Sequence, residues 1–277
     1  MGFRIATNVQ SLSSQRTLNT NREGQNRSLE KLAAGERITR ASDDAAGLAI
    51  SEKLKAEIRS LRQANRNAND GISLIQTAEG GANEIQNILI RLRELSMQSA
   101  TDTVGDVERG FTDKEVQNLV SEVQRISQVT SFNGKNLLNG TGGALEFQVG
   151  THNKPAEDRM IYDTTAADAT AEKLGIAGMT VAKKEDAQGN LAKLDEAIRV
   201  LNDNRAGFGA LQNRLQSTIN NLNVADENLS AANSRIRDVD IASESSELTK
   251  KNILMQAGTA MLAQANSNGM MALKLIA

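Results

Sequence analysis

The chain contains 277 residues, of which 39 % are hydrophobic and 24 % are charged, with a formal net charge of −2. It has no cysteine, which excludes disulfides and thiolate metal sites, and its small net charge gives no electrostatic basis for binding nucleic acid or an anionic membrane. Aromatic residues make up only 2 %, so the core must be built from Leu, Ile, Val and Ala between slender elements. No apolar run approaches the roughly 20 residues that span a bilayer, and the amino end lacks the apolar segment of a secretory signal, so any export would use another route.

The first 42 residues predict a weak amphipathic helix, because apolar residues recur at helical spacing around a polar middle. These apolar positions are Ile5, Val9, Leu12, Leu29, Leu32 and Ala33. Seven Arg or Lys oppose three Glu here, a local excess of +4, and this basic face is either simply solvated or docks on a partner. Gly35 has the character of a helix C-cap, and Asp43 and Asp44 are suited to cap the next helix. Without His, Cys or further acids at ligand spacing, the two carboxylates do not indicate a metal site.

Residues 45–100 predict a long helix, because apolar side chains recur every seventh residue as in a coiled coil. The repeat consists of Leu54, Leu61, Ala68, Ile75, Ala82 and Leu89. Gly71, Gly80 and Gly81 interrupt it, and each would cost about 1 kcal/mol relative to alanine.

Residues 101–110 are expected to form a loop. A capping-box pattern from Thr112 to Glu115 then predicts a third helix of about 17 residues, folded back against the first. Two Asn-Gly dipeptides follow, and residues 145–149 and 159–163 alternate in the manner of strands, which predicts a β-hairpin around 143–163. The hairpin loop holds the single histidine, His152, which we expect to be exposed. Residues 164–190 are polar and only weakly periodic, too short for a separate domain.

The stretch from 191 to 236 carries the strongest pattern in the chain. Its apolar seam consists of Leu194, Leu201, Phe208, Leu215, Leu222, Leu229 and Ile236. As one helix it would be roughly 70 Å long, whereas a compact globule of this length would be only about 50 Å across. The sequence therefore predicts a mainly α fold, an elongated antiparallel helical bundle or coiled coil with a small β-hairpin.

The carboxyl end predicts a joint near residues 238–246, followed by a final amphipathic segment. Its apolar residues are Ile253, Leu254, Ala257, Met261, Leu262 and Ala265, and the tail beyond them is also apolar. Short amphipathic helices are marginal alone, so both ends of the chain are expected to become ordered only when neighbouring molecules cover them.

Several segments resemble the terminal signatures of bacterial flagellin, the filament subunit. On the amino side they are residues 28–38 (SLEKLAAGERI), 43–51 (DDAAGLAIS), 67–80 (NANDGISLIQTAEG) and 92–95 (LREL). On the carboxyl side they are residues 212–215 (QNRL), 227–232 (ENLSAA), 234–238 (SRIRD) and 256–266 (QAGTAMLAQAN). The resemblance covers roughly 1–150 and 190–277, and the motifs together are highly specific.

The resemblance implies a structural subunit that self-assembles helically into the extracellular flagellar filament for swimming, with no enzyme activity and no cofactor. Residues 1–42 and 240–277 would pair as an inner helical domain in the filament core. Residues 43–239 would form a rod-like helical domain, with the short segment 164–190 where outer domains are usually inserted. Export would proceed, unfolded, through the flagellar type III apparatus.

The heptad repeats and the resemblance together assign residues to roles. Filament-core packing is expected of Ile5, Val9, Leu12, Leu254, Ala257 and Met261, and rod-helix packing of Leu54, Leu61, Ile75, Leu89, Leu201, Leu215, Leu222 and Leu229. Contact with an innate-immune Toll-like receptor would fall on Arg91, Leu95 and Glu122. Ile90 stands where agonist flagellins carry glutamine, which argues against recognition, and Arg91 and Glu122 are equally explained as solvated helix-face residues.

One alternative function is a hook–filament junction protein, which shares the helical ends. A second, of a different class, is a secreted coiled-coil translocator of an injection system. The intact signatures at 43–51 and 256–266 favour flagellin. Expected partners are other copies of the subunit, the filament cap protein, the hook–filament junction protein and an export chaperone. An enzyme is disfavoured, because a single histidine cannot form an H-E-x-x-H zinc site and no P-loop pattern occurs.

Overall fold

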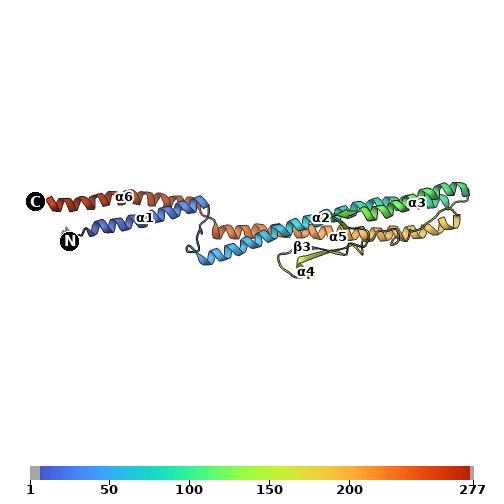
Figure 1. Cartoon of the computed structure of the whole chain (residues 1–277), viewed down its shortest axis with the longest axis horizontal. Helices are drawn as coiled ribbons and strands as arrows, with labels where there is room; N and C mark the ends of the chain where they lie inside the picture. The colour runs from blue at the N-terminus through green and yellow to red at the C-terminus, as the bar shows by residue number, and fades with distance from the viewer. Residues whose placement is uncertain (1–6, 275–277) are drawn as a thin grey trace. The chain divides into compact units, whose positions relative to one another are not determined.

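The computed structural model describes the backbone of residues 7–274 and the side chains of residues 7–268 (Figure 1). The fold is mainly helical, as predicted. The helices are α1 (Val9–Ala34), α2 (Ala45–Ser99), α3 (Asp106–Val129), α4 (Pro155–Asp158), α5 (Lys184–Arg237) and α6 (Ile241–Lys274). Two small antiparallel two-stranded sheets complete the described fold. Within this part of the chain, no helix is both long enough and apolar enough to cross a lipid bilayer.

The chain divides into two compact units. The terminal unit comprises Met1–Ile58 and Glu227–Ala277, and the central unit comprises Arg59–Asp226. The boundaries expected from the sequence, at 42/43 and 239/240, fall in the connections between helices, whereas the units divide within α2 and α5.

The core of the central unit lies between α2, α3 and α5. Ion pairs from Arg93 to Asp195 (2.7 Å) and from Arg62 to Asp226 (3.0 Å) connect α2 and α5 in an antiparallel pair. Side chains with no exposed surface fill the space between the helices, among them Ala68, Ile75, Ala82, Leu89, Leu194, Leu201 and Leu215. Leu, Ile and Ala side chains thus hold the unit together, with few aromatic rings among them.

Gly71 and Gly81 of α2 are points of close approach, Gly80 faces open space, and none of the three breaks the helix. A Cβ on Gly71 would lie 3.3 Å from the ring of Phe147, and one on Gly81 would lie 2.6 Å from Thr130 Oγ1. At Gly71 and Gly81 the cost of a helical glycine, about 1 kcal/mol, is offset because neighbouring segments pack directly on the helix backbone.

Helix α3 begins at Asp106, six residues before the predicted start, so the expected loop over 101–110 is wrong in its second half. Asp106 and Glu108 lie in the first turn, where the helix dipole favours acidic side chains. Thr112 is not a cap, because its hydroxyl donates to the carbonyl of Glu108 inside the helix (3.2 Å). The capping-box pattern therefore gave a start that was too late.

A buried arginine fixes the turn between α2 and α3. Arg109 is 7 % exposed, and it donates through Nε to the carbonyl of Ser99 (2.9 Å) and through Nη2 to the carbonyl of Thr101 (2.8 Å). An ion pair with Asp106 (2.7 Å) completes its contacts. These bonds satisfy carbonyls that the end of α2 leaves without helical partners.

The predicted β-hairpin is confirmed. Strand β3 (Ala144–Gln148) pairs antiparallel with β4 (Arg159–Asp163), and Ala144 lies opposite Asp163. His152 is exposed in the connecting loop. A second, very short hairpin was not predicted: β1 (Ser131–Phe132) and β2 (Lys135–Asn136) flank a turn at Asn133 and Gly134, both with positive φ.

Residues 164–183 contain neither helix nor strand, yet they are packed against the central unit. Their buried side chains are Thr164, Ala167, Ala169, Ala171, Leu174, Ile176, Met179 and Val181. Side chains of α3 bind the backbone of this segment: Asp113 accepts from Val181 N (2.8 Å), Gln117 donates to the Met179 carbonyl (2.7 Å), and Gln124 accepts from Ala171 N (3.0 Å). The segment is therefore an ordered part of the unit.

In the terminal unit, α1 and α6 lie side by side and antiparallel (Figure 1). Gly35 ends α1 with φ +71°, which confirms the predicted C-cap. Two backbone hydrogen bonds, from Arg37 N to the Arg237 carbonyl (2.6 Å) and from Val239 N to the Gly35 carbonyl (3.0 Å), join the segment after α1 to the segment before α6. Asp44 accepts from Gly47 N (2.8 Å) at the start of α2, in the capping role predicted for it.

Candidate functional site

The seam between α1 and α6 contains polar side chains beside apolar ones such as Leu18 and Ala265. In α1 the buried side chains are Ser11 and Ser28, which are 8 % and 4 % exposed. Hydrogen bonds cross the seam from Asn8 Nδ2 to the Ala265 carbonyl (2.9 Å), from Ser11 Oγ to Asn266 Oδ1 (2.9 Å) and from Gln25 Nε2 to Asn252 Oδ1 (2.6 Å). Hydroxyl and amide groups thus occupy positions that apolar side chains take in most paired helices.

Two glycines let these helices approach closely. A Cβ on Gly258 of α6 would lie 2.9 Å from Cδ2 of Leu18, and a Cβ on Gly24 of α1 would lie 2.8 Å from Nζ of Lys251. Leu18 therefore packs directly on the backbone of α6, and the stem of Lys251 crosses the backbone of α1. A Cβ at either glycine would have to displace the end of the side chain that faces it.

Several large apolar side chains of the pair are exposed, whereas Leu18, Leu32, Met255 and Leu262 are half-buried. The exposed fractions are Val9 62 %, Leu12 53 %, Ile253 60 %, Leu254 41 % and Met261 65 %; we call these five residues the outer apolar set. Leu254 and Met261 are two helical turns apart and so lie on the same side of α6. The pair thus leaves large apolar side chains exposed while burying Ser11 and Ser28, which is unfavourable for a helix pair alone in water.

The residues predicted for filament-core packing all lie in this unit. Ile5 falls outside the described residues. Val9, Leu12, Leu254, Ala257 and Met261 are exposed, so α1 and α6 come together without burying them in the seam. The seam residues themselves were not predicted from the sequence. A signal was present, since Ser11, Leu18 and Gln25 follow at intervals of seven, but their polarity concealed it.

The residues predicted for rod-helix packing divide by burial. Leu61, Ile75, Leu89, Leu201, Leu215 and Leu222 are buried in the central unit, whereas Leu54 and Leu229, in the terminal unit, are half-buried.

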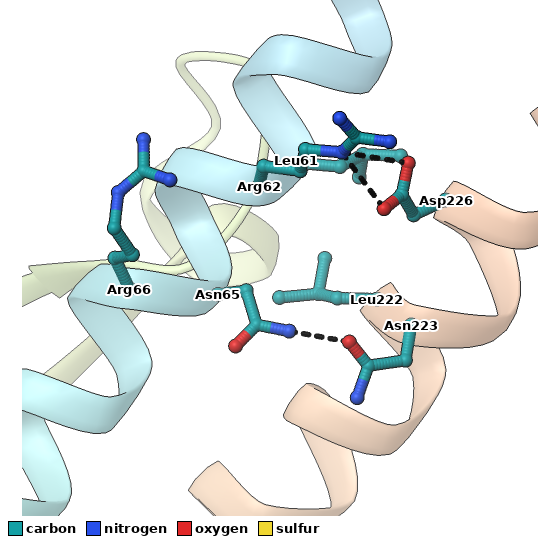
Figure 2. Close-up of a pocket in the computed structure, with 7 residues that line it drawn as sticks. All are labelled: Leu61, Arg62, Asn65, Arg66, Leu222, Asn223 and Asp226. Carbon is teal, nitrogen blue, oxygen red and sulfur yellow. Dashed lines mark hydrogen bonds and ion pairs between the residues drawn. The ribbon is translucent and has the colours of Figure 1, made fainter. Parts of the chain in front are cut away.

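A shallow surface cavity of about 250 Å³ lies beside Leu61 and Leu222, between α2 and α5 of the central unit (Figure 2). Its polar groups bond to one another: Arg62 pairs with Asp226, and Asn65 donates to Asn223 (2.6 Å). The side chain of Arg66 points away from these pairs (Figure 2). These bonded side chains fix the register of α2 against α5, and they do not form a catalytic arrangement.

The residues predicted to contact an innate receptor differ in exposure. Arg91 is exposed and pairs with Glu94 (3.1 Å) and Glu115 (2.9 Å), which raise its pKa. Glu122 is half-buried, and its bond to Arg125 (2.6 Å) lowers its pKa. Leu95 is only 2 % exposed and belongs to the core, so its side chain offers almost no surface to a partner.

Among the described residues, no three His, Cys, Asp or Glu side chains come together as metal ligands would. We therefore take the exposed apolar surface of the paired terminal helices as the candidate functional site.

Comparison with known proteins agrees with the signatures. The bacterial flagellin N-terminal helical region matches residues 5–142, and the C-terminal helical region matches residues 191–276. A flagellin of Halalkalibacterium halodurans is 44 % identical over 98 % of this chain and 99 % of its own length. A flagellin of Bacillus subtilis is 42 % identical, over 99 % of this chain and 100 % of its own.

Among solved structures, the crystal structure of Bacillus cereus flagellin is 31 % identical, with a TM-score of 0.51 over 57 % of this chain and 88 % of that chain. Matches to both helical regions, with identities above 40 % along nearly the whole chain, identify the family. The chain belongs to the bacterial flagellins, the structural and non-enzymatic subunits of the extracellular flagellar filament.

Proposed function

We propose that this flagellin polymerises through its terminal unit, with the outer apolar set becoming buried against neighbouring copies. The observation that carries the proposal is the exposure of large apolar side chains such as Leu12 and Met261 on the α1 and α6 pair, although Ser11 and Ser28 are buried. A helical polymer uses heterologous contacts, in which one surface of each subunit meets a different surface of the next. Such contacts can cover both helices of the pair.

The energies favour the assembled state. Each hydrogen bond across the seam contributes about 0.5–1.5 kcal/mol, so three of them give the isolated pair only a few kcal/mol against the entropy of ordering two helices. Full burial of a Val, Leu, Ile or Met side chain contributes about 1.5–3 kcal/mol. Covering the exposed half of five such side chains would therefore add on the order of 4–7 kcal/mol per subunit. Most of the stability of the pair would come from the filament.

Deletion of residues 254–277 gives a first test. The variant should remain helical and soluble but should not elongate filaments, and normal filaments would contradict the proposal. A sharper test is the triple substitution Leu12→Ser, Leu254→Ser and Met261→Ser, which removes apolar surface and keeps both helices.

Its matched control changes exposed residues of the same helices outside the outer apolar set: Gln10→Ala, Gln256→Ala and Ala263→Ser. Sedimentation and electron microscopy should show filaments from the control and none from the triple variant at equal concentration. Circular dichroism should show the same helical content in both. Equal assembly of the two variants would remove the outer apolar set from the interface.

We also propose that partners other than the subunit itself use the same surface. An export chaperone would cover the outer apolar set before assembly, and the junction and cap proteins would meet it at the two ends of the polymer. The triple serine variant should then bind each of the three purified partners at least tenfold more weakly than the control variant. Unchanged binding of any one partner would place that contact elsewhere.

For an innate-immune Toll-like receptor, we propose that Arg91 and Glu122 carry any recognition, because Leu95 is buried. Arg91→Ala should lower potency in a receptor-signalling assay, whereas Arg199→Ala, an exposed arginine on α5, should not. No change for Arg91→Ala would remove this site.

A further inference from the structure

We propose that the central unit contains a flexible joint, a level at which α2 and α5 open and bend more readily than elsewhere in the unit. It lies at Gly80 of α2 and Gly207 of α5, and we call it the glycine joint. The joint does not depend on the proposed function, because all the residues that form it belong to the central unit and none to the terminal helices.

The two glycines lie at nearly the same level of the antiparallel pair. The ion pair from Arg93 to Asp195 fixes the level of α2 against α5. Gly80 lies 13 residues before Arg93, and Gly207 lies 12 residues after Asp195. Each helical residue adds about 1.5 Å, so the glycines differ in height by only about one residue. The second ion pair between these helices, near the other end of the unit, gives the same difference.

Neither glycine is required by a close contact. A Cβ on Gly80 or on Gly207 would meet no neighbouring atom within 4 Å, and both residues are exposed. Gly209, two residues further along α5, also has open space around it. A glycine inside a helix is less stable than alanine, and at these positions no packing on the backbone offsets the difference. Both helices are therefore weakened at one level.

The third helix of the unit ends at this level. α3 ends at Val129, and the next residue, Thr130, lies against Gly81, which follows Gly80. On one side of this level the core lies between three helices. On the other side only α2 and α5 continue, and the hairpin of β3 and β4 packs on α2 at Gly71. The unit thus loses the support of α3 where its two long helices are weakest.

The side chains that connect the helices beside the joint are incompletely bonded. Arg205 of α5 donates through Nη1 to Gln86 of α2, and its Nη2 is 3.8 Å from Glu79. Its Nε, and Nδ2 of Asn204, are buried without an acceptor among the residues that the structure describes. A buried donor without an acceptor destabilises the arrangement that leaves it so. These contacts therefore oppose a change in helix tilt less than fully bonded pairs would.

The apolar core continues through the joint. Phe208 is 3 % exposed, and its ring centre lies 5.8 Å from that of Tyr162. Ala78 and Ala82, on either side of Gly80, are completely buried. The joint is thus a local weakness of two helix backbones and not a gap in the packing, so a bend there need not separate the helices.

Hydrogen exchange of backbone amides measures how readily each segment opens. In the full-length subunit, kept below the critical concentration for assembly, peptides covering residues 76–84 and 203–211 should exchange about tenfold faster than peptides covering 86–94 and 193–200. The joint variant, Gly80→Ala with Gly207→Ala, should slow exchange about fivefold in each of the two joint segments. Unchanged exchange in both segments would overturn the proposal.

The matched control is Gly110→Ala with Gly189→Ala. These glycines also lie inside helices and also have open space around them, but they belong to the section that α3 supports. The control should raise the denaturant midpoint about as much as the joint variant does, and it should leave exchange in 76–84 and 203–211 unchanged. If the control slows exchange there as much as the joint variant does, these segments open only when the whole unit unfolds, and there is no joint.

Bending is measured with two spin labels on α5. Because the chain has no cysteine, Ala192→Cys and Ser217→Cys introduce the only thiols. Both positions are exposed, and they lie 25 residues apart on the same side of the helix, one on each side of the joint. The distribution of label distances, measured by pulsed electron paramagnetic resonance, should be narrower by roughly one third or more in the joint variant and unchanged in the control. Equal widths in all three proteins would overturn the bend.

Discussion

Truncating one leucine of the outer apolar set should weaken filament growth by an amount that the structure fixes. Leu12→Ala removes three carbons, and full burial of three methylene equivalents contributes about 2.4 kcal/mol. Leu12 is 53 % exposed in the chain, so only about half of this, roughly 1.2 kcal/mol, remains to be gained on assembly. Since 1.4 kcal/mol corresponds to a factor of ten, the critical concentration for elongation should rise about sevenfold.

The assay is seeded elongation, with the critical concentration measured as the subunit that stays in solution at equilibrium. Gln10→Ala, an exposed change two residues away on α1, should alter the critical concentration by less than about twofold. Alanine is at least as good a helix former as leucine, so loss of helix would not explain a rise. A critical concentration for Leu12→Ala equal to that of the control would refute the assignment of this side chain to the interface.

Two further predictions concern the central unit. Arg109→Met should lower the free energy of unfolding by about 2–4 kcal/mol, because the carbonyls of Ser99 and Thr101 lose their charged donor in a buried site. The control Arg125→Met, on the exposed face of α3, should lower it by less than about 1 kcal/mol. Denaturant titration measures both values, and equal effects would contradict the capping role of Arg109. Burial, and secondarily the charge of Asp163, raise the pKa of Tyr162 well above its ordinary value of about 10. Above pH 10 the unfolded state therefore loses a proton that the folded state keeps, and the free energy of unfolding falls as the pH rises. Since Tyr162 is the only tyrosine and there is no tryptophan, phenolate absorbance should appear together with unfolding; a smooth titration near pH 10 in the folded protein would contradict its burial.

The long helices of the central unit could be predicted because heptad spacing requires only that apolar side chains face one another. Leu201 and Leu215 follow that pattern and are fully buried. The glycines of α2 could not be interpreted in the same way. Gly71 accommodates Phe147, a residue 76 positions away, and no local pattern reveals such a contact.

The start of α3 and the segment 164–183 show a second limit. Both depend on side chains that bind distant backbone groups: Arg109 on the carbonyls that end α2, and Asp113 on the amide of Val181. Such bonds have no sequence period. A segment held in this way looks like an irregular linker even where Ile176 and Val181 are completely buried.

In the terminal unit the sequence indicated the correct residues without their orientation. Leu12, Leu254 and Met261 are the apolar residues of two amphipathic helices, and periodicity alone would place them between those helices. They are exposed, while polar side chains such as Gln25, which have the composition of a solvated face, lie in the seam. The exposure of these apolar side chains is explained if another molecule covers them.

The central claim is that side chains exposed on this chain become buried in the filament, and oxidation of methionine tests it directly. Peroxide converts an accessible thioether to the sulfoxide, and mass spectrometry measures the conversion at each position. Met261 is 65 % exposed, whereas Met179 is 4 % exposed and serves as the protected reference in the same molecule. We predict that Met261 is oxidised rapidly in the monomer and as slowly as Met179 in the filament. Equal reactivity of Met261 in monomer and filament would contradict the account.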